Sequence, residues 1–254
     1  YYGKKVIILL DEYDTPMQEA YMHGFWNELV GFMRNIFNAA FKTNPHLCRG
    51  IMTGITRMSK ESIFSDLNNL EVVTTTVGKY GDAFGFTEAE VFAAMDELGR
   101  GDRAEVKRWY DGFVFGDRKD IYNPWSILNF LDTGKYAAYW ANTSSNGLAG
   151  KLIRESEPEV KRSFELLMRG EHIFAEIDEQ IVWQHLNQDS DAIFSLLLAA
   201  GYLKAVAVDD KPMLQGFGMP VYELALTNFE VRLMFTSMIR GWFRGAWKGE
   251  YNGF

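Results

Sequence analysis

The hydrophobic pattern at the start of the chain predicts a strand, a helix and a second strand, in that order. Residues 6–10, "VIILL", are a continuous apolar run that predicts a strand buried on both faces. Apolar side chains recur at helical spacing in residues 25–42, and the proline in "TNPHL" at 43–47 ends this predicted helix. Residues 48–55, "CRGIMTGI", predict the second strand. This order indicates a parallel sheet, which binds ligands beyond the carboxyl ends of its strands.

Residues 84–158 have a different pattern, in which short segments are rich in aromatic side chains. The segment "GFTEAEVFAAMDEL" contains Thr87 and Glu90, whose spacing is that of a capping box at the start of a helix. The further helices predicted in this part span residues 104–111, 124–132 and 147–155. The pattern therefore predicts a compact helical subdomain.

Residues 159–254 predict a region that mixes helices and strands. An amphipathic helix is expected at 159–170 and a buried, almost wholly apolar helix at 191–203. Two strands, "KAVAVD" and "VYELAL", follow the buried helix, and Asn228 is the predicted N-cap of the last helix. A buried helix followed by a hairpin is typical of a winged-helix module. The domains predicted from sequence are thus residues 1–83, 84–158 and 159–254.

Composition and charge narrow the class of protein. The chain has 254 residues, of which 47% are hydrophobic, and this content is ample for a real core. Its formal net charge of −8 argues against a broad, non-specific hold on nucleic acid, although a local basic patch could exist. Cys48 is the only cysteine, which excludes an intrachain disulfide and favours a cytoplasmic location. We expect no contact with a membrane, because no apolar run approaches the ~20 residues needed to cross a bilayer.

Two acids, Asp11 and Glu12, directly follow the first predicted strand. Mg²⁺ prefers oxygen ligands and keeps several waters, so Asp11 is a candidate to polarise a water in a Mg²⁺ shell, with nucleotide phosphates as further ligands. Glu12 is then the candidate to activate the attacking water. The alternative interpretation is an acidic surface turn, and spacing alone leaves both open. Tyr13 and Asp14 are expected to orient or cap.

The second predicted strand is followed by further candidates, Thr53, Thr56 and Arg57. These side chains lie beside the two acids if the strands are neighbours. The guanidinium of Arg57 could then bind a γ-phosphate, because its planar donors match phosphate oxygens. Alternatively, Arg57 pairs with Asp11 or Asp14 and neutralises it.

A phosphate-binding loop of the Walker type, GxxxxGK[ST], does not occur anywhere in the sequence. Six motifs nevertheless occur in a characteristic order: "KKVIILLDEYDTPM", "MTGITRMSKESIFSDLNNL", "FGFTEAEV", "WYDGFVFG", "IYNPWSILNFL" and "ALTNFEV". In these motifs the chain resembles a bacterial AAA-ATPase-like family whose members usually carry a C-terminal PD-(D/E)XK nuclease-like domain. The resemblance covers essentially the whole chain.

This resemblance implies a fold, two cofactors and three site residues. The implied fold is α/β, with a truncated parallel-sheet P-loop NTPase core, then a helical lid and a winged-helix-like region. The implied cofactors are ATP and Mg²⁺. Asp11 takes the metal-linked role of a Walker B strand, Glu12 takes the catalytic role, and Arg57 falls at a sensor-like position. Since the phosphate-binding loop and the nuclease-like domain are missing, the chain is expected to be a fragment without ATP hydrolysis of its own.

The function expected of the intact protein is binding, and hydrolysis, of Mg-ATP to control the attached nuclease-like domain. Its expected partners are nucleotide, nucleic acid and further copies of itself. The alternative is a degenerate scaffold that serves as a nucleic-acid or protein binding module, or for oligomerisation. Lys204, Lys211 and Arg232 are few, and lie amid Asp209 and Asp210, so packing or oligomerisation is favoured over DNA contact for the last region.

Overall fold

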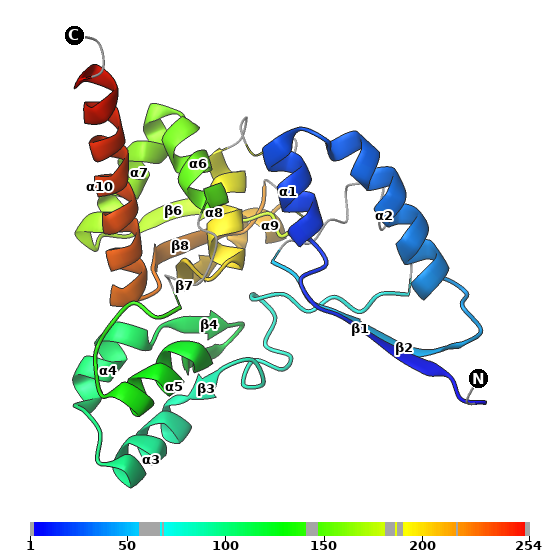
Figure 1. Ribbon diagram of the computed structural model, residues 1–254, viewed down its shortest axis with the longest axis horizontal. Coiled ribbons are helices and arrows are strands. Elements are labelled where there is room, and N and C mark those ends of the chain that lie inside the picture. Colours follow the sequence, from blue (N-terminus) through cyan, green and yellow to red (C-terminus); the bar gives the residue numbers. More distant parts are fainter. Residues whose placement is uncertain are drawn as a thin grey trace.

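The computed structural model of the protein contains three small sheets with helices packed against them (Figure 1). The residues that it describes are 3–55, 67, 69–140, 147–180, 186, 190–216 and 218–251, with side chains described as far as residue 242. The β1–β2 sheet lies at one side of the molecule with the N-terminus, away from the other two sheets (Figure 1).

The first sheet has the strand–helix–strand order that the sequence predicts. Strands β1 (Val6–Leu10) and β2 (Leu47–Met52) are parallel, and helices α1 (Thr15–His23) and α2 (Trp26–Phe41) connect them. Helix α1 was not predicted, because a proline shortly after polar residues also favours a turn. Proline is also favoured in the first turn of a helix, which is the place that Pro16 occupies.

The prediction that β1 is buried on both faces is wrong. Ile8 and Leu10 are partly buried against the core, but Ile7 is 62% exposed and Leu9 is 73% exposed. Leu9 pairs with Ile51 of β2, which is 50% exposed, so the open surface continues across both strands. The reason is that, among the described residues, this sheet has two strands and only one of its faces is covered.

The middle of the chain contains a sheet as well as the predicted helices. Its described elements are β3 (Phe86–Thr87), α3 (Glu88–Leu98), α4 (Arg103–Tyr110), β4 (Phe113–Phe115), β5 (Arg118–Tyr122) and α5 (Pro124–Thr133). The three strands form an antiparallel sheet in the order β3-β5-β4. The capping box of Thr87 and Glu90 is confirmed, and Asn123 caps α5 by accepting from the Ser126 amide.

The C-terminal part surrounds a second antiparallel sheet. Its described elements are α6 (Gly147–Glu155), α7 (Pro158–Arg169), β6 (Ile173–Glu176), α8 (Ser190–Ala199), β7 (Leu203–Asp209), α9 (Lys211–Leu214), β8 (Val221–Leu226) and α10 (Phe229–Tyr251). The predicted hairpin is present as β7 and β8, and the sheet order is β6-β8-β7. The likeness of this part to a winged helix stays a prediction.

One hydrophobic core joins the first helices to the C-terminal part. Met17 of α1 and Phe37 of α2 belong to the same buried cluster as Leu152 of α6 and Phe235 of α10. A smaller cluster, which includes Tyr110 and Phe130, fills the middle part. Among the described residues, no helix has the length and apolar character needed to span a bilayer.

Candidate functional site

The two candidate acids lie where the parallel strands β1 and β2 end together. The backbone pairing continues just beyond the strands: the Thr53 amide donates to the Leu10 carbonyl at 2.9 Å, and the Tyr13 amide donates to the Thr53 carbonyl at 2.9 Å. The predicted position of Thr53 beside the acids is therefore confirmed. We call Asp11, Glu12 and Thr53 the acid tip.

The Thr53 hydroxyl connects both acids to the neighbouring strand. It donates its proton to the Asp11 carboxylate and accepts a hydrogen bond from the Glu12 amide at 3.1 Å. A threonine hydroxyl can do both, since it has one proton and two lone pairs. Glu12 has a φ of 50°, in the left-handed region that few residues other than glycine adopt. The Thr53 hydroxyl thus holds the Asp11 side chain and an uncommon Glu12 backbone conformation.

The carboxylates of the acid tip are held on one side and open on the other. The Thr15 hydroxyl, at the start of α1, donates to Glu12 Oε2 at 3.1 Å. Asp11 and Glu12 are both exposed to solvent. An ionised carboxylate offers about four lone-pair sites, so each acid retains acceptors for a metal ion or its water ligands.

Asp14 differs from the acids of the tip because it is only 1% exposed. Its carboxylate accepts a hydrogen bond from the Ile55 amide at 3.1 Å, and it does not cap α1 through its side chain. Of the two roles expected for Asp14, the structure therefore supports orientation of the chain. Gly54 is required beside it, because a Cβ there would lie 2.7 Å from both Asp14 Oδ1 and Tyr13 Cε1.

Two carboxylates, those of Asp11 and Glu12, are exposed at the acid tip. Among the described residues, no group of three or more histidine, cysteine or acidic side chains could hold a metal. Mg²⁺ commonly binds through one or two carboxylates and completes its shell with water and phosphate oxygens, so Asp11 and Glu12 are the residues here that could hold it. Thr56 and Arg57 lie outside the described residues, so their predicted place beside the acids stays a prediction.

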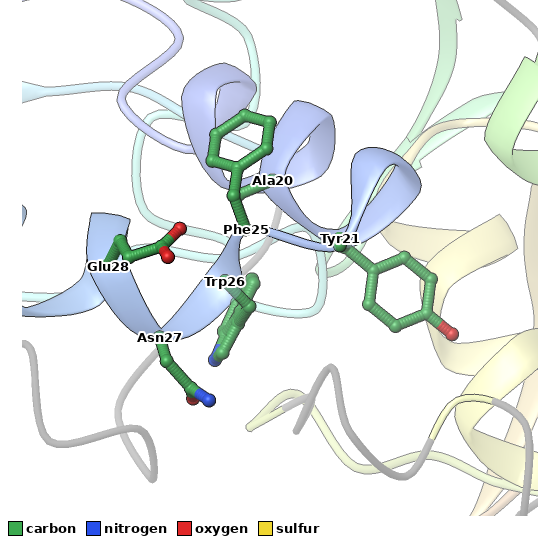
Figure 2. A pocket seen from close by; sticks show the side chains of 7 residues that line it. Ala20, Tyr21, Phe25, Trp26, Asn27 and Glu28 are labelled. Carbon is green, nitrogen blue, oxygen red and sulfur yellow. The ribbon is translucent and has the colours of Figure 1, made fainter.

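A shallow pocket of about 310 Å³ lies at the turn between α1 and α2. Figure 2 shows that Phe25 and Trp26 point to different sides of this turn, and do not converge on one point. The pocket includes Ala20 and Tyr21 near the end of α1, whereas the acid tip precedes the start of that helix. It is therefore separate from the acid tip.

A buried acid that the sequence did not reveal lies where the middle and C-terminal parts meet. Glu230, in the first turn of α10, is 0% exposed. Its carboxylate accepts from the Ser126 hydroxyl at 2.8 Å and from the Trp140 amide at 2.7 Å. The one available signal was its place two residues after the predicted N-cap Asn228, and the partners themselves are far away in sequence.

A partly buried cluster of charges lies near the same junction. Lys107 of α4 pairs with Glu88 and, at 2.8 Å, with Asp120; the Asp111 carboxylate is 3.7 Å from the ammonium. Burial raises the pKa of Asp111 to about 6, although Lys107 acts in the opposite direction. Burial also lowers the pKa of Lys204 on β7. Because it is partly buried, Lys204 is a poor candidate for contact with a nucleic-acid backbone.

Comparison with known proteins found a family match at the start of the chain. Residues 1–64 match a protein family described as "Predicted AAA-ATPase", and this range includes β1, β2 and the acid tip. The start of the chain is similar to predicted AAA-ATPases. The structure search found no matching solved structure.

A curated relative extends the similarity beyond that range. The protein named "Uncharacterized protein in vnfD 5'region", from Azotobacter chroococcum mcd 1, is 29% identical over 155 residues, or 60% of this chain. The aligned part spans only 30% of that relative's length. The name of this relative assigns no activity, so the similarity does not indicate a function for this chain.

Proposed function

We propose that this chain is part of an ATP-binding protein, and that the acid tip forms one side of its Mg-ATP site. Asp11 holds the magnesium ion, directly or through water, and Glu12 activates the water that attacks the terminal phosphate. The bound Mg²⁺ supplies positive charge that offsets charge on the phosphates. The match of residues 1–64 to predicted AAA-ATPases supports this assignment.

The observation that carries the proposal is the Thr53 hydroxyl bridge between the two strand ends. A surface turn that is acidic by chance has no need for a side chain of the next strand to hold both acids. Here Thr53 contacts Asp11 through its proton and Glu12 through its lone pair. Catalytic groups need such fixed positions, because small errors in placement lower the rate strongly.

The rest of the site belongs to other residues of a longer protein, according to this proposal. The sequence has no GxxxxGK[ST] loop, and the open face around Leu9 is suited to further strands or a helix of a larger parallel sheet. The aligned relative is also much longer than the aligned region. By this reasoning the chain alone does not hydrolyse ATP, since its sequence has no phosphate-binding loop of the Walker type.

The proposed role of the intact protein follows from the family resemblance. Nucleotide binding at the acid tip changes the position of the lid and so controls an attached nuclease-like domain, with Arg57 as a sensor of the γ-phosphate. Nucleic acid is then the target of that domain, and the intact protein also binds further copies of itself. The competing proposal is a scaffold of the same fold that has lost hydrolysis and acts only in binding.

The test uses the longer protein that contains this chain. We expect Glu12→Gln to keep Mg-ATP binding in calorimetry and to lower the hydrolysis rate by about 10²–10⁴-fold, the usual contribution of a general base. Asp11→Asn should weaken binding only when Mg²⁺ is present. Glu19→Gln is the matched control, because Glu19 is an exposed acid on α1 that pairs with His23.

Unchanged hydrolysis by the Glu12→Gln protein would refute the catalytic assignment. Mg-ATP binding without hydrolysis in the unaltered protein would support the scaffold instead. If the unaltered protein does not bind Mg-ATP, the proposed site itself is wrong.

A further inference from the structure

A second surface combines apolar side chains and cations in one groove. The groove has a volume of about 580 Å³ and is lined by residues of α1, α6 and α10, the helices labelled in Figure 1. Its apolar lining consists of Met22 at the end of α1 and, on α10, Met234, Met238 and Trp242. We call this surface the methionine groove.

The depth of the methionine groove depends on glycine. Gly150 of α6 lines it, and a Cβ at that position would lie 2.9 Å from the sulfur of Met238. Any larger side chain at 150 would therefore push Met238 out of place. Methionine is unbranched and flexible, so the lining can adapt to apolar side chains of different shapes.

The rim of the methionine groove carries two cations on α6. Lys151 and Arg154 are three residues apart, which places them about one helical turn from each other. Within the described part of the chain, Lys151 makes no ion pair and its ammonium lies 5.7 Å from the centre of the Tyr21 ring. Arg154 pairs with its exposed neighbour Glu155, which also lines the groove, at 3.4 Å. Such exposed pairs contribute little, so both cations are available to a partner.

We propose that the methionine groove binds an amphipathic helix of another protein, with apolar anchors on one face and acidic residues beside them. Helices that bind in grooves present anchors at positions i, i+3, i+4 and i+7. Carboxylates one turn apart on such a helix match the spacing of Lys151 and Arg154. Lys151 and Arg154 outnumber Glu155 on this rim, so the rim has an excess of one positive charge although the whole chain has a net charge of −8, and charge complementarity favours an acidic partner at this place.

The proposed partner helix contacts three helices of the chain at once, because the lining residues lie on α1, α6 and α10. Helix α1 begins at Thr15, whose hydroxyl contacts Glu12 of the acid tip. The inference does not depend on nucleotide binding. If the longer protein binds the helix but no nucleotide, the methionine groove is supported and the proposed function is refuted.

The test uses two synthetic helical peptides of about 20 residues, longer than the length at which isolated helices are marginal. Both carry leucine at positions i, i+3, i+4 and i+7; one has flanking glutamates and the other has lysines in their place. Binding of each labelled peptide to the chain is measured by fluorescence anisotropy at low salt. We expect the glutamate peptide to bind and the lysine peptide to bind at least tenfold more weakly, a difference of about 1.4 kcal/mol.

Charge reversal provides the matched test of the rim. The double variant Lys151→Glu and Arg154→Glu should reverse the preference, so that the lysine peptide now binds more tightly. The double variant Lys135→Glu and Lys161→Glu is the control, because it changes the net charge by the same amount at two exposed positions outside the groove. Met238→Glu should weaken both peptides, and circular dichroism melting curves establish that each variant is folded.

Several results would overturn the proposal. These are failure of the glutamate peptide to bind, equal binding of both peptides, or a preference that charge reversal does not change. Sedimentation that shows a dimer of the chain, dissociated by Met238→Glu, would assign the groove to a second copy. Binding to anionic phosphatidylserine vesicles that the charge-reversed variant loses, without peptide binding, would assign it to lipid.

Discussion

The acid tip and the buried Glu230 are both carboxylates at the ends of secondary-structure elements, but their surroundings differ. Asp11 and Glu12 are exposed and are held from one side by Thr53. Glu230 is wholly buried and receives hydrogen bonds from two parts of the chain that are distant in sequence, at Ser126 and Trp140.

This difference separates a structural acid from acids that are able to bind a ligand. A buried carboxylate must be satisfied by fixed donors, because an unpaired buried polar group costs several kcal/mol. Glu230 therefore uses its acceptors within the protein and ties α5 and α10 together. The acid tip keeps acceptors free, which is what a metal site requires, and contributes little to folding. The two regions consequently predict opposite effects of mutation.

Glu230→Ala is expected to have the largest effect on folding. The substitution leaves the Ser126 hydroxyl and the Trp140 amide without their acceptor, and each buried unsatisfied group costs about 1–3 kcal/mol. We therefore expect the free energy of unfolding to fall by about 3–5 kcal/mol in urea denaturation. Asp11→Ala, measured in the same way, should change it by less than about 0.5 kcal/mol. Equal losses for the two variants would remove the distinction between the regions.

Asp14→Ala sharpens the comparison within one short segment. Asp14 is three residues from Asp11, yet it is buried and accepts from the Ile55 amide at 3.1 Å. Its loss should lower the free energy of unfolding by about 2–3 kcal/mol, because the amide is left without its acceptor. Hydrogen exchange at the Ile55 amide provides an independent measurement. Exchange as slow as in the unaltered protein would contradict the assigned role.

Local patterns explain which parts of the fold were predictable from sequence. The capping box of Thr87 and Glu90 and the cap at Asn123 involve residues within three positions, so the sequence contains the whole interaction. Burial of β1 was predicted wrongly because an apolar run does not reveal what covers it. The strands β3 and β4 have only two and three residues, too few for a period to be recognised.

The candidate site was predictable only as far as strand order determines it. Parallel pairing brings residue 53 beside residues 11 and 12, so their proximity follows from the order of the strands. The double role of the Thr53 hydroxyl depends on side-chain geometry, which the order of the strands does not provide. Glu230 was missed because its contact with Ser126 joins residues that are 104 positions apart.

The pH dependence of stability offers a third comparison, through Asp111. Burial raises the pKa of this carboxyl to about 6 from 3.8, so between these values the folded protein holds a proton that the unfolded chain releases. The stability contributed by Asp111 is present below pH 3.8 and is lost as the pH rises to about 6. Asp111→Asn removes the titrating group.

We compare the free energy of unfolding of the Asp111→Asn variant with that of the unaltered protein. The variant's value minus the unaltered protein's value should be larger at pH 7 than at pH 4.5. The expected increase is on the order of 2 kcal/mol, because one pKa unit corresponds to about 1.4 kcal/mol. Urea denaturation at both pH values measures it. Lys107 and Asp120 face Asp111, so Asp120→Asn is the necessary control. The pKa of Asp120 is lowered, chiefly by its hydrogen bond with Lys107. Removal of the Asp120 carboxylate should therefore not produce the same trend with pH. The same stability difference at both pH values would contradict the prediction.

Leu9→Ser should have the smallest effect, although leucine in a parallel strand is normally essential to a core. Leu9 is 73% exposed, so its replacement in this chain should change the free energy of unfolding by less than about 0.5 kcal/mol. Leu152→Ala is the buried control, at 2% exposure, and should cost about 2–5 kcal/mol. A loss above about 2 kcal/mol for Leu9→Ser in this chain would mean that the face is covered after all. If residues outside the chain complete the sheet, Leu9→Ser should lower the free energy of unfolding strongly in the longer protein, although it has almost no effect in this chain.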